Sequence, residues 1–168
     1  ICNVLRNLSK SEYNNRVVFK GGTSLSKGHH IIKRFSEDVD LAVINEPKLS
    51  NNQIKDLIRN VEKAVTPDLT EKEVEGTTSK GSRFRKTVFT YPTVLKNNAS
   101  NTLLTEINSF ANPFPYSKKT IETFISKFFR ESGRADFVVK YGLEAFEVNV
   151  MDANQTLVEK LVYLIRFS

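Results

Sequence analysis

The sequence has 168 residues, of which 25 are Lys or Arg and 19 are Asp or Glu, so its formal net charge is +6 at pH 7. A basic excess of this size favours an anionic partner without identifying it. The single cysteine, Cys2, excludes an internal disulfide, and no apolar run approaches the length of a membrane-spanning helix. We therefore expect one cytoplasmic domain with a hydrophobic core and no membrane partner.

Hydrophobic periodicity predicts interspersed helices and strands with hairpins, which favours an α/β (α+β) fold, a mixed β-sheet with packed helices. Ser50 and Gln53 form a capping-box pattern, whereas residues 66–82 are polar and typical of an exposed loop. The expected elements in chain order are a helix over 1–9, a strand over 17–19, a helix from 23 to about 35, a strand over 39–44, a helix over 54–65, strands over 83–91 and 102–110 joined by a turn over 96–101, a helix over 121–129, strands near 136–140 and 144–150, and a helix from about 156.

Two of these helices carry apolar side chains at helical spacing. One has an aromatic stripe that includes Phe124 and Phe128, and the last helix has Leu157, Leu161 and Leu164. We expect both stripes to face the core.

A β-branched strand stops at Gly21-Gly22, where the lack of Cβ atoms lets the backbone approach a ligand closely. Thr23 or Ser24 would cap the next helix, and a helix N-terminus favours phosphate. With Lys27 as a further donor, Gly21, Gly22, Thr23, Ser24 and Lys27 are candidates for nucleotide binding. A P-loop is excluded, because its Gly-Lys-Ser/Thr order is missing after these glycines.

Three carboxylates are candidates for catalysis and metal binding. Asp38 and Asp40 open the second strand, and side-chain alternation places both on one face. Mg²⁺ binds carboxylate and phosphate oxygens, and paired ions can stabilise both oxygens of an in-line displacement. Glu106 lies in an apolar strand, where a lone carboxylate is costly unless it is paired, metal-bound or solvent-facing. The pattern predicts phosphoryl transfer with Mg²⁺ or Mn²⁺ as cofactor.

Two stretches, Gly21-Gly22-Thr23-Ser24-Leu25-Ser26-Lys27 and Arg34-Phe35-Ser36-Glu37-Asp38-Val39-Asp40-Leu41, resemble the signature of the AbiEii/AbiGii-type toxin nucleotidyltransferases. This family belongs to the DNA polymerase β-like nucleotidyltransferase superfamily. The resemblance implies that fold, a glycine loop for the phosphates, a metal-binding pair at Asp38 and Asp40, and a third carboxylate at Glu106.

The stretch from Asp152 to Lys160 resembles a second motif of that family, Asp-Pro-x-Arg-Thr-Leu-x-Glu-Lys, with Ala153 and Gln155 in place of Pro and Arg. The resemblance implies that Lys160 contacts the nucleotide, and it leaves a role for Asp152 open.

The resemblance also implies the activity: transfer of a nucleoside monophosphate from an NTP to an acceptor hydroxyl, with transfer RNA or another RNA as acceptor. It further implies a toxin with a cognate antitoxin and a role in phage defence. The alternative is a non-catalytic nucleotide- or RNA-binding domain with the same fold. Because the family continues past its last helix here, we expect residues 1–168 to be a nucleotidyltransferase domain from a longer protein, without its C-terminal helical region.

A basic cluster lies beside Phe84 and Phe89 in the strand predicted over 83–91. Basic residues interleaved with aromatics can follow a nucleic-acid backbone, but they also occur on solvated strand faces. Both interpretations stay open for Lys80, Arg83, Arg85 and Lys86.

Overall fold

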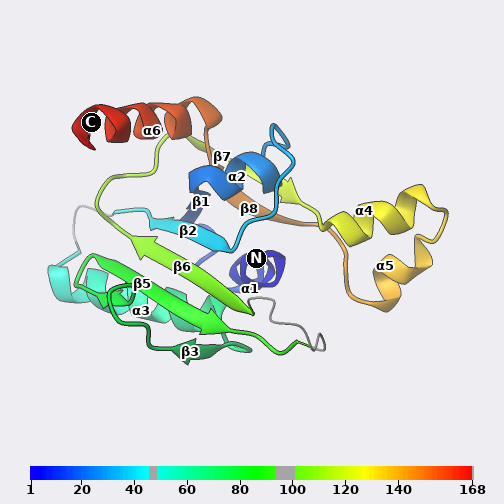
Figure 1. Cartoon of the computed structure of the whole chain (residues 1–168), viewed down its shortest axis with the longest axis horizontal. Helices are drawn as coiled ribbons and strands as arrows, with labels where there is room; N and C mark the ends of the chain where they lie inside the picture. Colours follow the sequence, from blue (N-terminus) through cyan, green and yellow to red (C-terminus); the bar gives the residue numbers. More distant parts are fainter. Residues whose placement is uncertain (46–48, 94–100, 168) are drawn as a thin grey trace.

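The computed structural model describes residues 1–45, 49–93 and 101–167, and Figure 1 shows a mixed sheet with helices packed on it. Most of the turn predicted over 96–101 lies outside the described residues. The helices are α1 (Cys2–Lys10), α2 (Gly21–Lys27), α3 (Asn51–Val65), α4 (Phe124–Glu131), α5 (Asp136–Lys140) and α6 (Ala153–Phe167), and the strands are β1 (Val17–Lys20), β2 (Asp38–Val43), β3 (Thr70–Lys72), β4 (Ser79–Lys80), β5 (Phe84–Thr90), β6 (Thr102–Asn108), β7 (Tyr116–Ile121) and β8 (Phe146–Met151).

The strands form one sheet in the order β3-β5-β6-β2-β1-β8-β7, and β4 pairs with β5. The β2–β6 and β1–β8 pairs are parallel, while the other pairs are antiparallel. The predicted mixed sheet is therefore confirmed. Its central strands, β6, β2 and β1, bring together segments that are distant in the sequence.

The hydrophobic core lies between one face of the sheet and the helices α1 and α3. Phe19, Leu41 and Ile107 are fully buried on that face, and α1 and α3 cover them with residues such as Leu5 and Ile58. Side chains alternate along a strand. The residues one position away therefore face the opposite side of the sheet, where α2 lies.

The sequence prediction of α3 is confirmed down to its cap. The Gln53 amide N–H donates to Ser50 Oγ at 3.3 Å, and the Ser50 amide N–H donates to Gln53 Oε1 at 2.8 Å. This reciprocal pair satisfies two amide groups at the helix start.

The prediction for the segment after β1 is wrong at both ends. Lys20 is the N-cap residue and α2 begins at Gly21, so Thr23 and Ser24 lie inside the helix. The helix ends at Lys27 instead of continuing to Phe35. Its last turn closes when the Gly28 amide donates to Ser24 O, and a positive φ of 56° at His30 is incompatible with further helix.

Two further predictions are corrected. The loop predicted over 66–82 contains β3 and β4, which both pair with β5. The strand predicted near 136–140 is the short helix α5. A run of three apolar residues (137–139) does not distinguish strand from helix by periodicity. Gly133 and Gly142, with φ of 75° and 62°, flank this segment.

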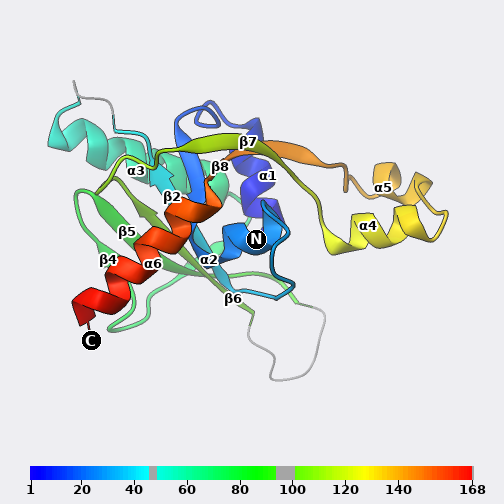
Figure 2. The ribbon, with the colours of Figure 1, turned by 90° about the horizontal axis from the view of Figure 1, so that it is seen from above.

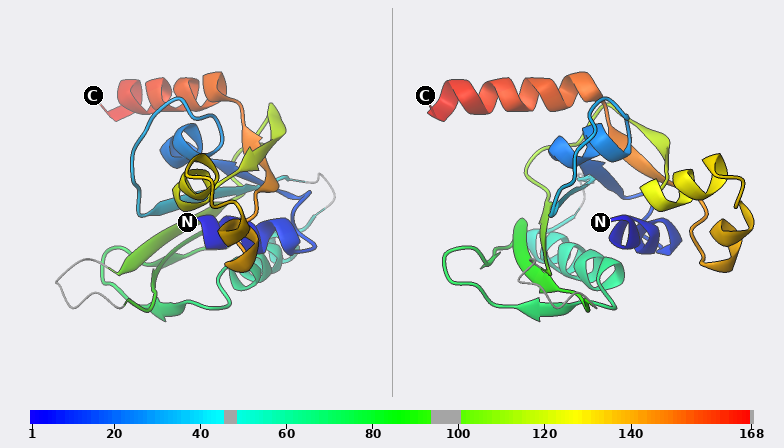
Figure 3. Two further views of the ribbon diagram at one scale, coloured as in Figure 1. Left: turned by 90° about the vertical axis from the view of Figure 1, so that its right-hand side faces the viewer. Right: turned by 45° about the vertical axis from the view of Figure 1, so that its right-hand side comes forward.

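Neither predicted apolar stripe faces the core. Phe124 and Phe128 on α4 are 44% and 64% exposed, and α4 and α5 project away from the sheet (Figure 3). In α6, Leu157 and Leu164 are 55% and 62% exposed. Starting from its N-terminus, this helix crosses over the sheet, and its C-terminal part extends past the edge of the sheet (Figure 2). Within the described residues, no helix combines the length and hydropathy needed to cross a membrane.

Candidate active site

The face of the sheet opposite the core carries the predicted carboxylates. Asp38 and Asp40 occupy the first and third positions of β2, so they share this face. In the parallel β2–β6 ladder, Asp40 lies beside Glu106 and Asp38 lies beside Leu104. The structure thus brings Asp40 and Glu106 together, with Asp38 at the exposed start of the strand.

The environment of Asp40 disfavours its negative charge. Burial first, and then the nearby charges of Glu106 and Asp38, raise the pKa of Asp40 from an ordinary value of 3.8 to about 6. Lys20 and Lys160 act in the opposite direction but do not offset these effects. Carboxylates packed this closely form a site where a bound cation would relieve repulsion.

Glu106 is engaged by a lysine from the neighbouring strand. Lys86 lies opposite Glu106 in the antiparallel β5–β6 ladder, and its ammonium is 2.6 Å from Glu106 Oε1. The hydrogen bond from this ammonium raises the pKa of Lys86. Lys86 therefore belongs to the carboxylate cluster rather than to a basic strip along β5.

The donor set fits a divalent cation at the β2 pair. Asp38 and Asp40 place carboxylate oxygens, the kind of ligand that divalent cations prefer, on one face, and burial together with the charges of Glu106 and Asp38 raises the pKa of Asp40. Across the described ranges, however, no three His, Cys, Asp or Glu side chains are arranged as a complete metal site. Glu106, the expected third ligand, is held by Lys86.

The two glycines leave room for side chains of the chain itself. Gly21 has a φ of 74°, and a Cβ there would lie 2.8 Å from Asp40 Cγ, so any larger residue would displace this carboxylate. A Cβ at Gly22 would lie 3.0 Å from an Arg34 guanidinium nitrogen and 3.8 Å from Lys160 Nζ. Gly21 therefore accommodates the acid, whereas Gly22 lies where two cations converge.

The hydroxyls after the glycines are directed inward. Thr23 Oγ1 donates to Ser36 Oγ at 2.8 Å, and Ser24 Oγ donates to Gly21 O at 2.7 Å. Ser36 Oγ also accepts the amide N–H of Asp38 at 3.3 Å. The two buried hydroxyls thus hold α2 and the loop before β2 in position, rather than presenting donors to a ligand as the sequence suggested.

Lys27 lies away from the other candidates. It occupies the far end of α2 from Gly21, and its ammonium lies 3.6 Å from the centre of the Phe124 ring. Its side chain lines a different cavity from the one at Asp40.

A cavity of about 610 Å³ is lined by Asp40 and Glu106, but not by Asp38, and α6 closes it on one side. Helix α6 is positioned by an ion pair of 2.9 Å between Lys20 and Glu159, and its buried Thr156 donates to Asp152 O at 3.3 Å. Asp152 Oδ1 accepts the amide N–H of Asn154 at 2.8 Å, so Asp152 caps the helix. The lining residues are Lys20, Gly21, Asp40, Glu106, Asn108, Thr156, Glu159, Lys160, Tyr163 and Leu164.

Sequence reasoning missed Lys20, Asn108 and Tyr163 in this cavity. Lys20 lies opposite Asp40 in the antiparallel β1–β2 ladder. This strand register could not be predicted from the sequence. Lys20 does immediately precede the glycine pair, which is the one signal that pointed to it.

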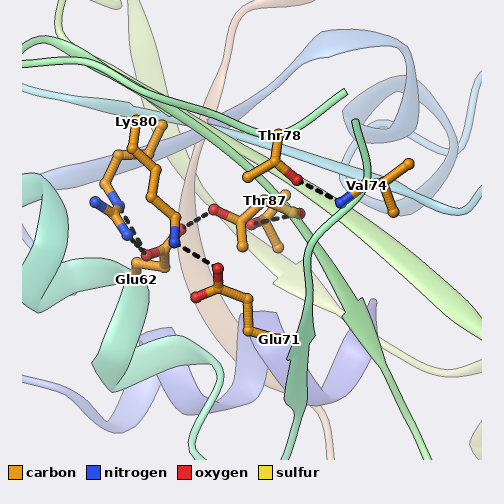
Figure 4. A network of polar contacts seen from close by, with 8 residues as sticks. Glu62, Glu71, Val74, Thr78, Lys80 and Thr87 are labelled. Atoms are coloured by element: carbon orange, nitrogen blue, oxygen red, sulfur yellow. Dashed lines mark hydrogen bonds and ion pairs between the residues drawn. The ribbon is translucent and has the colours of Figure 1, made fainter. Parts of the chain in front are cut away.

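The basic cluster of β4 and β5 is divided among separate partners. Thr87 donates to the buried Glu62 of α3, and Lys80 pairs with Glu71 (Figure 4). Arg85 also donates to Glu62. Arg83 donates to Asn51 Oδ1 at 3.0 Å. The alternation of β5 explains the division, because Arg85 faces α3 and Lys86 faces the carboxylates. The four side chains do not form one surface for a nucleic-acid backbone.

The sequence model of a family described as "Nucleotidyl transferase AbiEii toxin, Type IV TA system" matches residues 3–168. This chain belongs to the AbiEii toxin family. No curated protein sequence matches the chain. The solved structure of MenT4, a nucleotidyltransferase toxin from Mycobacterium tuberculosis, superposes with a TM-score of 0.59 at 18% identity. The match covers 95% of this chain and 49% of that one, so this chain spans about half the length of MenT4 and shares its fold.

Proposed function

We propose that this AbiEii protein is a nucleotidyltransferase that moves a nucleoside monophosphate from an NTP to an acceptor hydroxyl. The observation that carries the proposal is the position of Asp40. It lies beside Glu106 on a parallel strand and against Gly21, with Lys160 and Arg34 converging on the adjacent glycine. A carboxylate group next to converging cations suits a substrate that carries phosphates and reacts at phosphorus.

The chemistry would be an in-line displacement at the α-phosphorus of the NTP. The acceptor oxygen forms the new bond to phosphorus, the bond to the bridging α–β oxygen breaks, and pyrophosphate leaves. Arg34 and Lys160 would bind the negative charge of the triphosphate near Gly22, as supported by their approach to this glycine. Glu106, whose position is fixed by Lys86, would accept the proton of the acceptor hydroxyl.

Asp38 and Asp40 would hold Mg²⁺ or Mn²⁺. When bound, such an ion stabilises the negative charge that develops on the phosphate oxygens. Gly21 and Gly22 would form one wall of the triphosphate site. Thr23 and Ser24 would act through the internal hydrogen bonds that position the loop before Asp38.

Membership of the family supports a toxin that is inhibited by a cognate antitoxin. We propose RNA, with transfer RNA as the first candidate, as the acceptor, a site of action in the cytoplasm, and phage defence as the biological role. The net charge of +6 supports a polyanionic acceptor.

The test is transfer of label from each α-labelled NTP to total RNA and to protein in Mg²⁺. Wild type, Asp40→Asn and Asp56→Asn would be compared, since Asp56 is an exposed carboxylate on α3 and pairs only with the neighbouring Arg59 in the described chain. We expect label with wild type and Asp56→Asn and none above background with Asp40→Asn. Equal labelling by all three proteins would contradict the proposed site.

A second candidate is a nucleotide- or RNA-binding domain without turnover. The Lys86–Glu106 ion pair supports it, because a lysine occupies the position next to the third carboxylate. NTP binding that is unchanged in Asp40→Asn, with no labelled product from any NTP, would favour this function.

A further inference from the structure

A second cavity, of about 300 Å³, lies at the opposite end of α2 from Asp40. It is formed by the end of α2, the loop that follows it and the start of α4, which lie next to one another in Figure 2. We call it the lysine cavity, after Lys27, Lys33 and Lys127 in its wall. None of these lysines contacts the carboxylates of the candidate active site.

The charge of the lysine cavity is positive. His30 adds a fourth basic side chain to its lining, while Glu122, the one acid there, is paired with Arg130. Lys127 approaches Glu131 at 3.7 Å, but both side chains are more than 60% exposed, and such surface pairs bind weakly. Lys33 makes no ion pair with the described residues and stays exposed.

Lys27 is the strongest sign of a ligand. Its residue is 8% exposed, and its ammonium makes no hydrogen bond or ion pair with any described residue. In the described chain its ammonium lies over the face of Phe124, at 3.6 Å from the ring centre. A ring face offsets only part of the cost of removing an ammonium from water. An anionic group in the cavity would supply the missing partner.

Aromatic side chains border the same cavity. Phe124 is 44% exposed, and Phe35, at 87% exposed, contacts it edge to face with ring centres 5.7 Å apart. Exposed aromatic faces beside lysines match the two components of a nucleic-acid strand, its stacked bases and its phosphates. A bare phosphate would use the lysines only.

The lysine cavity is connected to the candidate active site by two short segments. Gly21 and Lys27 are the first and last residues of α2, which corresponds to about 9 Å along the helix axis. Lys33 lines the lysine cavity, whereas its neighbour Arg34 reaches Gly22. One strand could therefore contact both regions.

We propose that the lysine cavity binds a single-stranded segment of the RNA acceptor, with a phosphate at Lys27, Lys33 and Lys127 and a base on Phe124. The assignment of this RNA as the acceptor rests on the proposed nucleotidyl transfer. The binding itself requires neither NTP nor metal. An acidic protein segment fits the charge of the cavity but not its aromatic face.

The test measures fluorescence anisotropy of a labelled single-stranded RNA 12-mer with the protein in EDTA and without NTP. Lys33→Ala/Lys127→Ala is compared with Lys55→Ala/Lys63→Ala, which removes the same charge from exposed positions on α3. We expect the first double variant to bind at least tenfold more weakly. The slope of log K against log salt should fall by at most about 0.7, because the three lysines share one phosphate and each phosphate contact contributes about 0.7 on a single strand. Equal losses in both double variants would overturn the proposal.

Two further measurements separate the ligand classes. Phe124→Leu should weaken RNA binding several-fold without changing the salt slope, because it removes the stacking face and no charge. ATP that displaces the RNA, with its own affinity lost in Lys33→Ala/Lys127→Ala, would instead assign the cavity to the NTP. A poly-glutamate 12-mer that binds as tightly as the RNA would assign it to an acidic protein. Either result would overturn the proposal.

The RNA binding and the activity can fail independently. Binding that depends on Lys33 and Lys127, with no label transfer from any NTP, would support the cavity and contradict the nucleotidyl transfer. Label transfer by wild type, together with an RNA affinity that does not change when Lys33 and Lys127 are replaced, would support the nucleotidyl transfer and contradict the role of the cavity.

Discussion

Replacement of Asp40 by Asn should make the metal-free protein more stable at neutral pH, although it removes a central residue of the candidate active site. Burial and the neighbouring Glu106 and Asp38 disfavour the charged form of Asp40. Asparagine has nearly the same shape and carries no charge. The ionised Asp40 therefore lowers the free energy of unfolding of wild type, and the variant lacks this destabilisation, which is common at functional sites.

The magnitude follows from the pKa of Asp40, which is about 6 in the folded protein and 3.8 as its ordinary value. Between these values the folded state binds more protons than the unfolded state, so the stability of wild type falls as the pH rises from about 4 to about 6. At 1.36 kcal/mol per pH unit, the loss is at most about 3 kcal/mol above pH 7. For a chain of this length, such a gain in Asp40→Asn corresponds to a Tm increase of about 6–12 °C.

The assay is urea unfolding of wild type, Asp40→Asn and Asp56→Asn in EDTA at pH 4.5 and pH 8. We expect Asp40→Asn to gain stability over wild type at pH 8 and to lose most of this advantage at pH 4.5. Asp56→Asn should differ from wild type by less than about 1 kcal/mol, because its ion pair is exposed. Addition of Mg²⁺ at pH 8 should then stabilise wild type but not Asp40→Asn.

Two results would refute this reasoning. One is an Asp40→Asn variant that is no more stable than wild type at pH 8. The other is a gain of the same size at both pH values, which would mean that packing and not charge is responsible.

Three other substitutions test separate parts of the account. Gly21→Ala should abolish nucleotidyl transfer and destabilise the protein by more than Gly76→Ala in urea unfolding, because both glycines have a φ of 74° but only Gly21 faces a carboxylate. The control Gly76→Ala alone should cost about 1–2 kcal/mol of stability. Equal losses of stability in the two variants would contradict the close approach of Asp40 to Gly21. Glu62→Gln should cost about 3 kcal/mol in the same assay, since it leaves the largely buried guanidinium of Arg85 without its acid. Glu71→Gln, in an exposed pair, should cost less than about 1 kcal/mol. Similar values for the two variants would show that the Glu62 network does not anchor β5. Lys86→Gln should tighten Mn²⁺ binding in calorimetry by about fivefold, because it removes a positive charge and frees Glu106 from its ion pair. The repulsion between two unit charges about 4 Å apart is worth about 1 kcal/mol in water. Weaker Mn²⁺ binding by the variant would show that Lys86 helps to assemble the site.

The sequence predicted the part of the site that is encoded locally. The strand that stops at Gly21, and the alternation that places Asp38 and Asp40 on one face, both depend on short-range rules. Glu106 was selected because a lone carboxylate in an apolar strand is costly and because the family resemblance implies a third carboxylate there. The partner itself, Lys86, was not found, because it depends on the register between β5 and β6.

The errors also have physical causes. Local pattern describes where apolar residues lie on a helix but not what covers them. The leucines of α6 and Phe124 and Phe128 of α4 have helical spacing, yet they remain exposed in the described residues. Phe129 of α4 contacts Phe137 and Tyr141 around α5, so part of this stripe packs in a small local cluster instead of the core. Lys27 illustrates the same limit, because the sequence identified its charge but not the cavity that it enters.

The central claim is that the carboxylates at β2 and β6 act on the α-phosphorus of an NTP. The most direct measurement uses one NTP labelled at either the α- or the γ-phosphate and follows both labels in the presence of RNA and Mg²⁺. The account predicts that the α-label enters RNA while the γ-label leaves in pyrophosphate, and that Asp40→Asn does neither. Transfer of the γ-label to an acceptor, or bound NTP that never yields pyrophosphate, would contradict it.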